Sequence, residues 1–297
     1  MTFDVKSAGE FPRALADGLW MLGNYFFNLY FVQGKQAGAL IEVGVSAIVD
    51  DVIGQMEAVG IVPTFLVVTH PHADHVTGLA GLRKRYPEAL VVAPDGAREF
   101  LDHPKAAEGL ILEDGRIAEF LESHGIRPGR PPVDEPPSLE NCLTARDGDE
   151  MDLGGRTLRF IRVTGHSPGA VAVHVPEIEA LLLSDSLGFR YPGRGVFPLF
   201  FTGYSDYMET LDRLRSLEPA VVGPAHQGPL TGIHINEAFD ESRRLAMELR
   251  DKIRKDPRDP DEIAGDVFET YYRDEMTMYT EENILNCAQL VVKRARE

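Results

Sequence analysis

One segment organises this 297-residue sequence: Thr69-His70-Pro71-His72-Ala73-Asp74-His75. Residues 64–68, directly before it, are apolar and largely β-branched or aromatic and follow Pro63, which is typical of a buried strand. Apolar residues then return at helical spacing at Val76, Leu79, Leu82 and Tyr86. We therefore expect the segment to form the loop between the carboxyl end of a strand and a helix that begins near His75.

The chemistry of this loop indicates a metal ion. Three imidazoles and one carboxylate lie between His70 and His75, and without a partner the imidazoles would repel one another as they became charged. Neutral imidazole and carboxylate are ligands that zinc and iron prefer, so a divalent cation removes the conflict. The alternative is a polar surface loop that is rich in histidine, and the residues downstream count against it.

Three more candidate ligands each come directly after an apolar segment with the pattern of a strand: His166, Asp185 and His226. Strands and helices alternate in the first third of the chain, which is the mark of an α/β layer structure. In such proteins the side chains at the carboxyl ends of strands converge on one edge of the sheet. We therefore expect seven residues to meet there: His70, His72, Asp74, His75, His166, Asp185 and His226.

This spacing resembles that of the metallo-β-lactamase superfamily, whose HxHxDH motif is followed by separate His, Asp and His positions. The resemblance extends over roughly residues 17–232, apart from an insertion. It implies an α/β fold, a four-layer αββα sandwich with the metal site at one edge of the paired sheets. It also implies a ligand set for two metals: His70, His72 and His166 for the first, Asp74, His75 and His226 for the second, and Asp185 as the bridge.

The implied cofactors are two divalent metal ions, with zinc favoured and iron or manganese also accepted by this ligand set. Such pairs lie about 3.5–4 Å apart and lower the pKa of bound water from 15.7 towards about 7. The implied function is therefore a dinuclear metal-dependent hydrolase in which metal-bound hydroxide attacks a carbonyl. Asp74 and Asp185 are the expected catalytic residues.

Three parts of the chain are expected. A catalytic core spans residues 1–232, and a helical extension spans residues 233–297. A helical and proline-rich insertion occupies residues 95–140, with an apolar helix face at Leu110, Ile117, Phe120 and Leu121. The insertion is either a surface excursion or a lid over the site, because long loops in compact domains are often functional. The extension either packs near the site or forms the surface of a homodimer.

Within the superfamily, the insertion, the segment Ser184–Gly188 and the helical tail look most like the thioesterase branch, which includes glyoxalase II-like and quinolone-signal response thioesterases. The best-supported substrate is thus a thioester, an acyl-CoA or a glyoxalase II-like one. An aromatic loop could form an apolar wall for it or could simply be packing: Phe189, Tyr191, Phe197, Phe200 and Phe201. The alternatives are a lactonase or phosphodiesterase, a mononuclear-iron persulfide dioxygenase, and a non-catalytic binding member of the fold.

The sequence departs from the family pattern at Glu42-Val43-Gly44, where many members have Asp-Thr-Gly. We expect Glu42 to support the site from behind the ligands, with a longer reach. The run Gly165-His166-Ser167-Pro168-Gly169 matches the G-x-S-x-G nucleophile elbow, but a strand pattern follows it where the elbow requires a helix. Ser167 is therefore expected to shape a turn, and His174 to be a partly exposed strand residue.

Composition restricts the partners. The net charge of −17 argues against nucleic acid and against an anionic membrane surface, because both require a basic field. Two cysteines, Cys142 and Cys287, are too few for a disulfide framework, and residues 1–18 have no apolar core of signal-peptide length. We expect a cytoplasmic enzyme with a small-molecule substrate, no nucleic acid and no membrane partner.

Overall fold

The computed structural model describes residues 11–191 and 193–297. Ten residues of the segment 1–18 and Pro192 in the aromatic loop therefore lie outside the described residues. Among the described helices, none is both long and apolar enough to cross a membrane.

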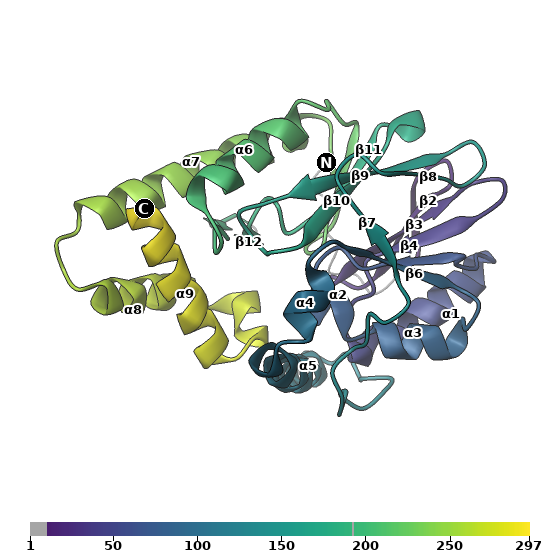
Figure 1. Cartoon of the computed structure of the whole chain (residues 1–297), viewed down its shortest axis with the longest axis horizontal. Helices are drawn as coiled ribbons and strands as arrows, with labels where there is room; N and C mark the ends of the chain where they lie inside the picture. The colour runs from purple at the N-terminus through teal and green to yellow at the C-terminus, as the bar shows by residue number, and fades with distance from the viewer. Residues whose placement is uncertain (1–10, 192) are drawn as a thin grey trace.

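Two large sheets form the centre of the molecule in the described part of the chain (Figure 1). The first has seven strands in chain order: β1 (Arg13–Ala16), β2 (Leu19–Gly23), β3 (Asn28–Gln33), β4 (Gly38–Ile41), β5 (Phe65–Val67), β6 (Leu90–Pro94) and β7 (Leu143–Ala145). The second has the order β15 (Leu230–Thr231), β14 (Val221–Pro224), β11 (Ala180–Ser184), β10 (Ala170–Val175), β9 (Thr157–Val163) and β8 (Glu150–Asp152). A separate hairpin joins β12 (Phe189–Tyr191) to β13 (Gly195–Phe197).

The two sheets pack face to face through alternate residues of their strands. Tyr30 and Val32 of β3 belong to the same buried cluster as Phe160 of β9 and Val173 of β10. Phe31, the residue between them on β3, belongs instead to the cluster that contains the helices. Because successive side chains of a strand point to opposite faces, each sheet has one face in the shared core and one under helices. This is the αββα arrangement predicted from the resemblance.

Helices cover the outer faces of both sheets (Figure 1). On the side of the first sheet lie η1 (Ser46–Ile48), α1 (Val49–Val59), α2 (Ala73–Val76), α3 (Leu79–Arg85), α4 (Ala97–Leu101) and α5 (Pro104–Ser123). Beside the second lie α6 (Tyr204–Arg215) and the start of α7 (Ile233–Lys255), and a short turn, η2 (Pro176–Ile178), follows β10. The chain then returns through α8 (Pro260–Tyr271), η3 (Asp274–Met278) and α9 (Glu281–Arg296), which begins close to α5.

The helix pattern of the insertion and of the tail is confirmed. The predicted apolar face of α5 is buried at Leu110, Ile117, Phe120 and Leu121. Pro104 does not interrupt α5, because it occupies the first helical position, where its missing N–H is not needed. Thr280 caps α9 by accepting a hydrogen bond from the backbone N–H of Asn283 through its hydroxyl oxygen.

Several details differ from the sequence-based expectation. The helix expected from His75 is divided into α2 and α3, and at the break the backbone N–H of Gly78 donates to the carbonyl oxygen of Gly44 and not to a residue of α2. The β12–β13 hairpin lies within a segment that was expected to be an irregular loop. His174 does lie on the outer face of β10, but it is only 8% exposed, so the expectation of a partly exposed residue was wrong.

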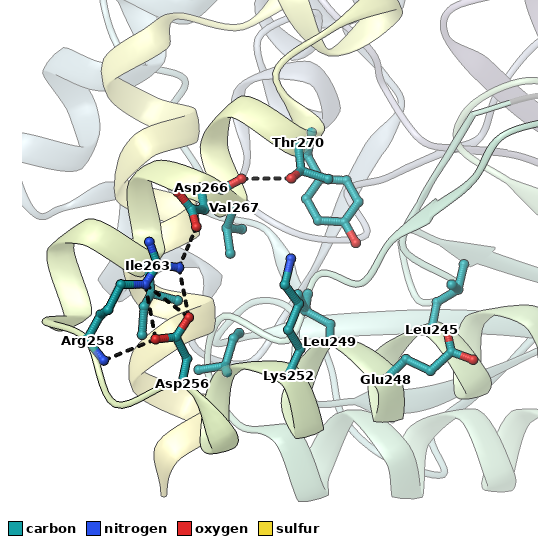
Figure 2. Close-up of a pocket in the computed structure, with 12 residues that line it drawn as sticks. Leu245, Glu248, Leu249, Lys252, Asp256, Arg258, Ile263, Asp266, Val267 and Thr270 are labelled. Atoms are coloured by element: carbon teal, nitrogen blue, oxygen red, sulfur yellow. Dashed lines mark hydrogen bonds and ion pairs between the residues drawn. The ribbon is translucent and has the colours of Figure 1, made fainter.

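A cavity of about 180 Å³ lies between α7 and α8 (Figure 2). Its lining is apolar along Leu249, Ile253 and Val267, and Arg258 bonds to Asp256 and Asp266 at one end. None of the seven candidate ligands lines this cavity. It therefore belongs to the packing of the tail helices and is separate from the site described next.

Candidate metal centre

All seven predicted ligands come together at one edge of the paired sheets. They form two groups, and within each group the potential ligand atoms lie within 4.8 Å of one another. The first group consists of His70, His72, His166 and Asp185, and the second of Asp74, His75, Asp185 and His226. Asp185 belongs to both groups, and every member except the half-buried His72 is buried.

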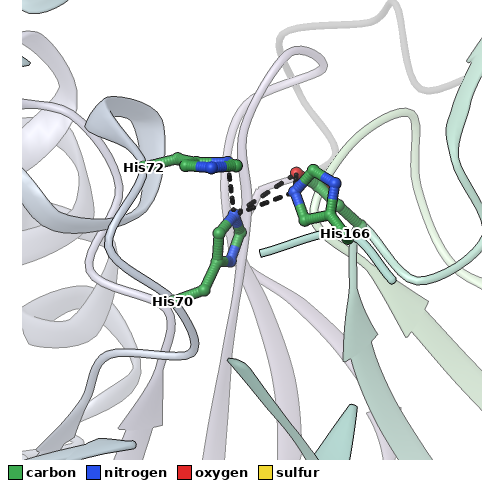
Figure 3. A group of neighbouring side chains, drawn as sticks. His70, His72 and His166 are labelled. Carbon is green, nitrogen blue, oxygen red and sulfur yellow. Dashed lines mark hydrogen bonds and ion pairs between the residues drawn. The ribbon is translucent and has the colours of Figure 1, made fainter. Parts of the chain in front are cut away.

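In the first group, three imidazoles face one another (Figure 3). His70 Nε2 lies 3.1 Å from His72 Nδ1 and 3.3 Å from His166 Nε2. The Asp185 carboxylate is 3.4 Å from His166 Nε2 and 3.6 Å from His70 Nε2. Convergent ring nitrogens with a carboxylate beside them are a typical ligand set for a divalent transition metal.

In the second group, two carboxylates meet two imidazoles. His75 Nε2 lies 3.1 Å from Asp74 Oδ2 and 3.2 Å from Asp185 Oδ2. His226 Nε2 lies 3.3 Å from Asp74 Oδ2 and 3.4 Å from Asp185 Oδ1. Asp185 Oδ2 also faces His70 and His166 of the first group, so this carboxylate adjoins the histidines of both groups.

The outer nitrogen of several rings is held by an oxygen. His75 Nδ1 lies 3.0 Å from Glu42 Oε2, His226 Nδ1 lies 2.6 Å from the carbonyl oxygen of Phe26, and His166 Nδ1 lies 3.3 Å from that of Leu199. A ring that donates its Nδ1 proton outward presents the lone pair of Nε2 to the site.

Two of these inward nitrogens test whether a metal fits the site. Nε2 of His75 and Nε2 of His226 are buried and make no hydrogen bond among the described residues. A buried polar atom without a partner is costly, and a cation between these nitrogens and the carboxylates would satisfy both. The donor set therefore fits two divalent metals, each held by one group.

Backbone geometry at two strand ends positions the centre. Glu42 follows β4 with a φ of 73°, in the left-handed region that non-glycine residues rarely adopt, and Ser184 precedes Asp185 with a φ of 52°. Glu42 also accepts a hydrogen bond of 2.8 Å from the hydroxyl of Thr69, which adjoins the motif. Glu42 thus lies behind His75, where the departure from the family pattern led us to expect it.

Charge differs between the groups. Burial, followed by the neighbouring imidazoles, lowers the pKa of His70 well below its usual value and lowers that of His72 to about 3. Burial alone would also lower the pKa of His226, but Asp185 and Asp74 outweigh it and raise that pKa to about 10. His75 is shifted upward for the same reason, because Asp74, Glu42 and Asp185 outweigh the effect of burial on its pKa.

The carboxylates stay ionised. Burial alone would raise the pKa of Asp74 and of Asp185, but the nearby His75 and His226, and for Asp185 also His166, hold both pKa values well below the usual range. These two acids supply negative charge that divalent cations would balance.

Sequence reasoning missed Tyr279. Its hydroxyl donates a hydrogen bond of 2.6 Å to Asp74 Oδ2 from a position 205 residues later in the chain. Burial, followed by Asp74 and Asp185, raises the pKa of this phenol well above its usual value, so it remains a proton donor. No pattern around Tyr279 marked it, because it lies in a tail recognisable only as helical.

Aromatic side chains of the predicted loop border the ligands. The ring centroid of Phe189 lies 5.4 Å from that of His226, and Phe201 lies 5.4 Å from His166. Ser167 is buried, and the chain enters strand β10 three residues later. The nucleophile elbow needs a helix at that point, so the serine-hydrolase alternative is not supported.

Comparisons with known proteins agree with this site. The family model of the metallo-β-lactamase superfamily matches residues 23–226. A metallo-β-lactamase fold-containing protein of Sulfurisphaera tokodaii is 27% identical over 205 residues, which is 68% of this chain and 72% of that protein. An acyl-coenzyme A thioesterase of Homo sapiens is 26% identical over 69% of this chain and 75% of its own length. A hydroxyacylglutathione hydrolase of Ruegeria pomeroyi is 30% identical over 50% of this chain and 42% of its own length.

Solved structures give the same fold. A β-lactamase domain protein from Burkholderia ambifaria superposes with a TM-score of 0.66 at 20% identity, covering 97% of this chain and 88% of that one. A metallo-β-lactamase family protein from Thermus thermophilus gives a TM-score of 0.63 at 22% identity, covering 92% and 93%. At these identities the likeness concerns the fold alone.

This chain belongs to the metallo-β-lactamase superfamily. Its relatives include a hydroxyacylglutathione hydrolase and acyl-coenzyme A thioesterases, which fit the branch that the resemblance implied. The predicted superfamily, the αββα architecture and the hydrolase class of its relatives are thereby confirmed.

Proposed function

We propose that this protein is a dinuclear metal-dependent hydrolase that cleaves a thioester. The observation that carries the proposal is the sharing of Asp185 by two groups, the second of which has two buried inward nitrogens, His75 Nε2 and His226 Nε2, without a hydrogen-bond partner. In this proposal His70, His72 and His166 hold one cation, Asp74, His75 and His226 hold the other, and Asp185 holds both. Zinc is favoured, and iron or manganese would suit the same donors.

Bound cations would supply Lewis-acid polarisation of a carbonyl and a water with a pKa near 7. The residues of the chain would accept protons and hold the ligands in position. Asp74 and Asp185 remain ionised at neutral pH, so their oxygens can accept a hydrogen bond or a proton from an attacking water. Glu42 and the carbonyl of Phe26 fix the rings of His75 and His226, so these ligands need not reorganise during the reaction.

Two observations support a thioester as the substrate. The relatives with a named activity include acyl-coenzyme A thioesterases and hydroxyacylglutathione hydrolases, both of which act on thioesters. Phe189 and Phe201 lie against ligand rings and are both buried, so they give the expected point of attack an apolar boundary. The proposed substrate is therefore a small molecule, an acyl-CoA or acyl-glutathione.

The proposal also assigns the parts of the chain. Residues 1–232 would form the catalytic core, residues 95–140 the insertion, and residues 233–297 an extension that packs near the site. The hydrogen bond from Tyr279 to Asp74 supports this placement of the extension.

The test is metal-dependent turnover of a panel of acyl-CoA and acyl-glutathione thioesters. The protein would be purified without chelators or a metal-affinity tag, and its metal content measured by elemental mass spectrometry. We expect about two metals per chain, activity on at least one thioester, loss of that activity on chelation, and its return with Zn²⁺. Full metal content without thioester turnover would contradict the substrate class, and no metal after reconstitution would contradict the hydrolase itself.

A further inference from the structure

The tail of the chain reaches into the metal centre at one residue. Tyr279 lies between η3 and α9 and is half-buried, and its hydroxyl donates to Asp74 Oδ2 at 2.6 Å. That oxygen also faces His75 Nε2 at 3.1 Å and His226 Nε2 at 3.3 Å. The phenol therefore touches the atom of Asp74 that would bind the second cation.

The insertion holds the residue next to Tyr279. Glu113 of α5 accepts hydrogen bonds from the backbone N–H of Thr280, at 3.1 Å, and from the hydroxyl of Thr280. One helical turn further along α5, Arg116 donates to the carbonyl oxygen of Thr277, at 2.9 Å. Both contacts fix the short segment that carries Tyr279 against α5.

Asp114, which follows Glu113 on α5, connects this helix to the metal motif. Asp114 is fully buried and accepts hydrogen bonds from the backbone N–H of Ser46, at 3.1 Å, and of Val133, at 2.9 Å. It also accepts from the hydroxyl of Thr77, the residue that follows α2 and lies two residues after the HxHxDH motif. Two adjacent carboxylates on α5 thus fix the motif helix and the tail segment to one rigid element.

We propose that Tyr279 is a positioning residue for Asp74, and that Glu113 positions Tyr279 through Thr280. The insertion and the extension would then together complete the second group, whereas none of the described hydrogen bonds joins either of them to the first group. This inference rests on the metal centre of the proposed function. The physical reason is that a hydrogen bond to a ligating carboxylate fixes its orientation, and loss of such a partner typically weakens metal binding about 10–100-fold.

The test compares Tyr279→Phe with the wild type and with Tyr271→Phe. Tyr279→Phe removes only the hydroxyl. Tyr271→Phe removes a hydroxyl from the same extension, where the ring stacks on Phe197 at 4.2 Å and none of the described hydrogen bonds joins it to a ligand. Binding of Zn²⁺ would be followed in competition with a chelating dye, and Co²⁺ substitution would give an absorption spectrum of each site without any turnover.

We expect Tyr279→Phe to bind the second equivalent of Zn²⁺ about tenfold more weakly, with the first equivalent unchanged and the Co²⁺ spectrum of one site altered. Tyr271→Phe should match the wild type in both measurements. Glu113→Gln, which leaves the phenol in place, should shift the second equivalent in the same direction by a smaller factor. Glu113→Gln also tests the inference if Tyr279→Phe fails to fold.

Two results would overturn the inference. If Tyr279→Phe and Glu113→Gln bind both equivalents as tightly as the wild type does, Tyr279 is only packing, and the proposed hydrolase stands. If the wild type itself binds no Zn²⁺ or Co²⁺, the inference and the metal-dependent function fail together.

Discussion

The two ligand groups share Asp185 but depend on different parts of the molecule. His70, His72 and His166 of the first group sit on loops of the paired sheets. The second group adds Asp74, whose oxygen is bonded by Tyr279 from the far end of the chain. The contrast indicates that the first half of the centre is formed by loops of the paired sheets, while the other half also involves the C-terminal segment that carries Tyr279.

The groups differ in charge as well. Burial and neighbouring imidazoles lower the pKa of His70 and His72, so these rings are neutral and ready to bind a metal. Carboxylates raise the pKa of His75 and His226, so in the second group a proton competes with the cation. We therefore expect the first group to hold its cation under more acidic conditions than the second.

The largest effect is expected from a change to Asp185, the residue that both groups share. Asp185→Asn keeps the shape of the side chain but removes the charge that both groups share. We expect metal content to fall from about two per chain to one or fewer, and thioester kcat/KM to fall about a thousandfold, which corresponds to about 4 kcal/mol. Elemental mass spectrometry and initial rates measure both. Wild-type metal content in this variant would show that Asp185 is not a bridge.

A pair of variants tests whether the groups are separate. His72→Ala should remove the cation of the first group and His226→Ala that of the second, so each should retain about one metal per chain with activity reduced roughly a hundredfold. If either variant loses both metals, the centre binds them as a unit. In that case the contrast between the groups would not describe two independent sites.

Glu42→Gln tests whether a residue that contacts a ligand of only one group affects only that group. Glu42 contacts His75 of the second group through its Oε2, and the glutamine would no longer place a charged acceptor there. We expect Zn²⁺ binding by the second group to weaken about tenfold while the first group keeps its affinity. Dye competition measures both equivalents, and an equal loss from both would contradict the separation.

The smallest effect concerns pH and the metal-free protein. His226 has a pKa of about 10 in the folded chain, against about 6.5 when unfolded. A raised pKa stabilises the fold fully below pH 6.5, and this contribution is lost as the pH rises towards 10. We expect the Tm of chelator-treated protein to fall by a few degrees between pH 7 and pH 10. The Zn²⁺-loaded protein should change less, because its ring is already deprotonated, and an equal decline in both would count against these charges.

How much of this was visible in the sequence depends on the residue. His166, Asp185 and His226 could be placed at one sheet edge, because each follows an apolar strand and the carboxyl ends of such strands converge. The burial of the α5 face at Ile117 and Leu121 followed from helical spacing in the same way. These predictions rest on the local spacing of apolar residues, which can be read from a single sequence.

Other features depend on contacts that no local pattern encodes. Alternation in β10 placed His174 on the outer face but could not say that this face would be covered, so its burial was missed. The β12–β13 hairpin was missed because glycine and proline obscured its strand pattern. Tyr279 was missed because the hydrogen bond to Asp74 joins two segments that share no sequence signal.

The distance between Tyr279 and Asp74 along the sequence also affects the order of events during synthesis of the chain. A chain made at about 5–20 residues per second needs roughly 10–40 s to extend over the 205 residues between them. During that interval the HxHxDH motif has been synthesised while its tyrosine has not. Metal capture by the nascent protein should therefore begin at the first group, and the second cation should be secured only as synthesis reaches the tail.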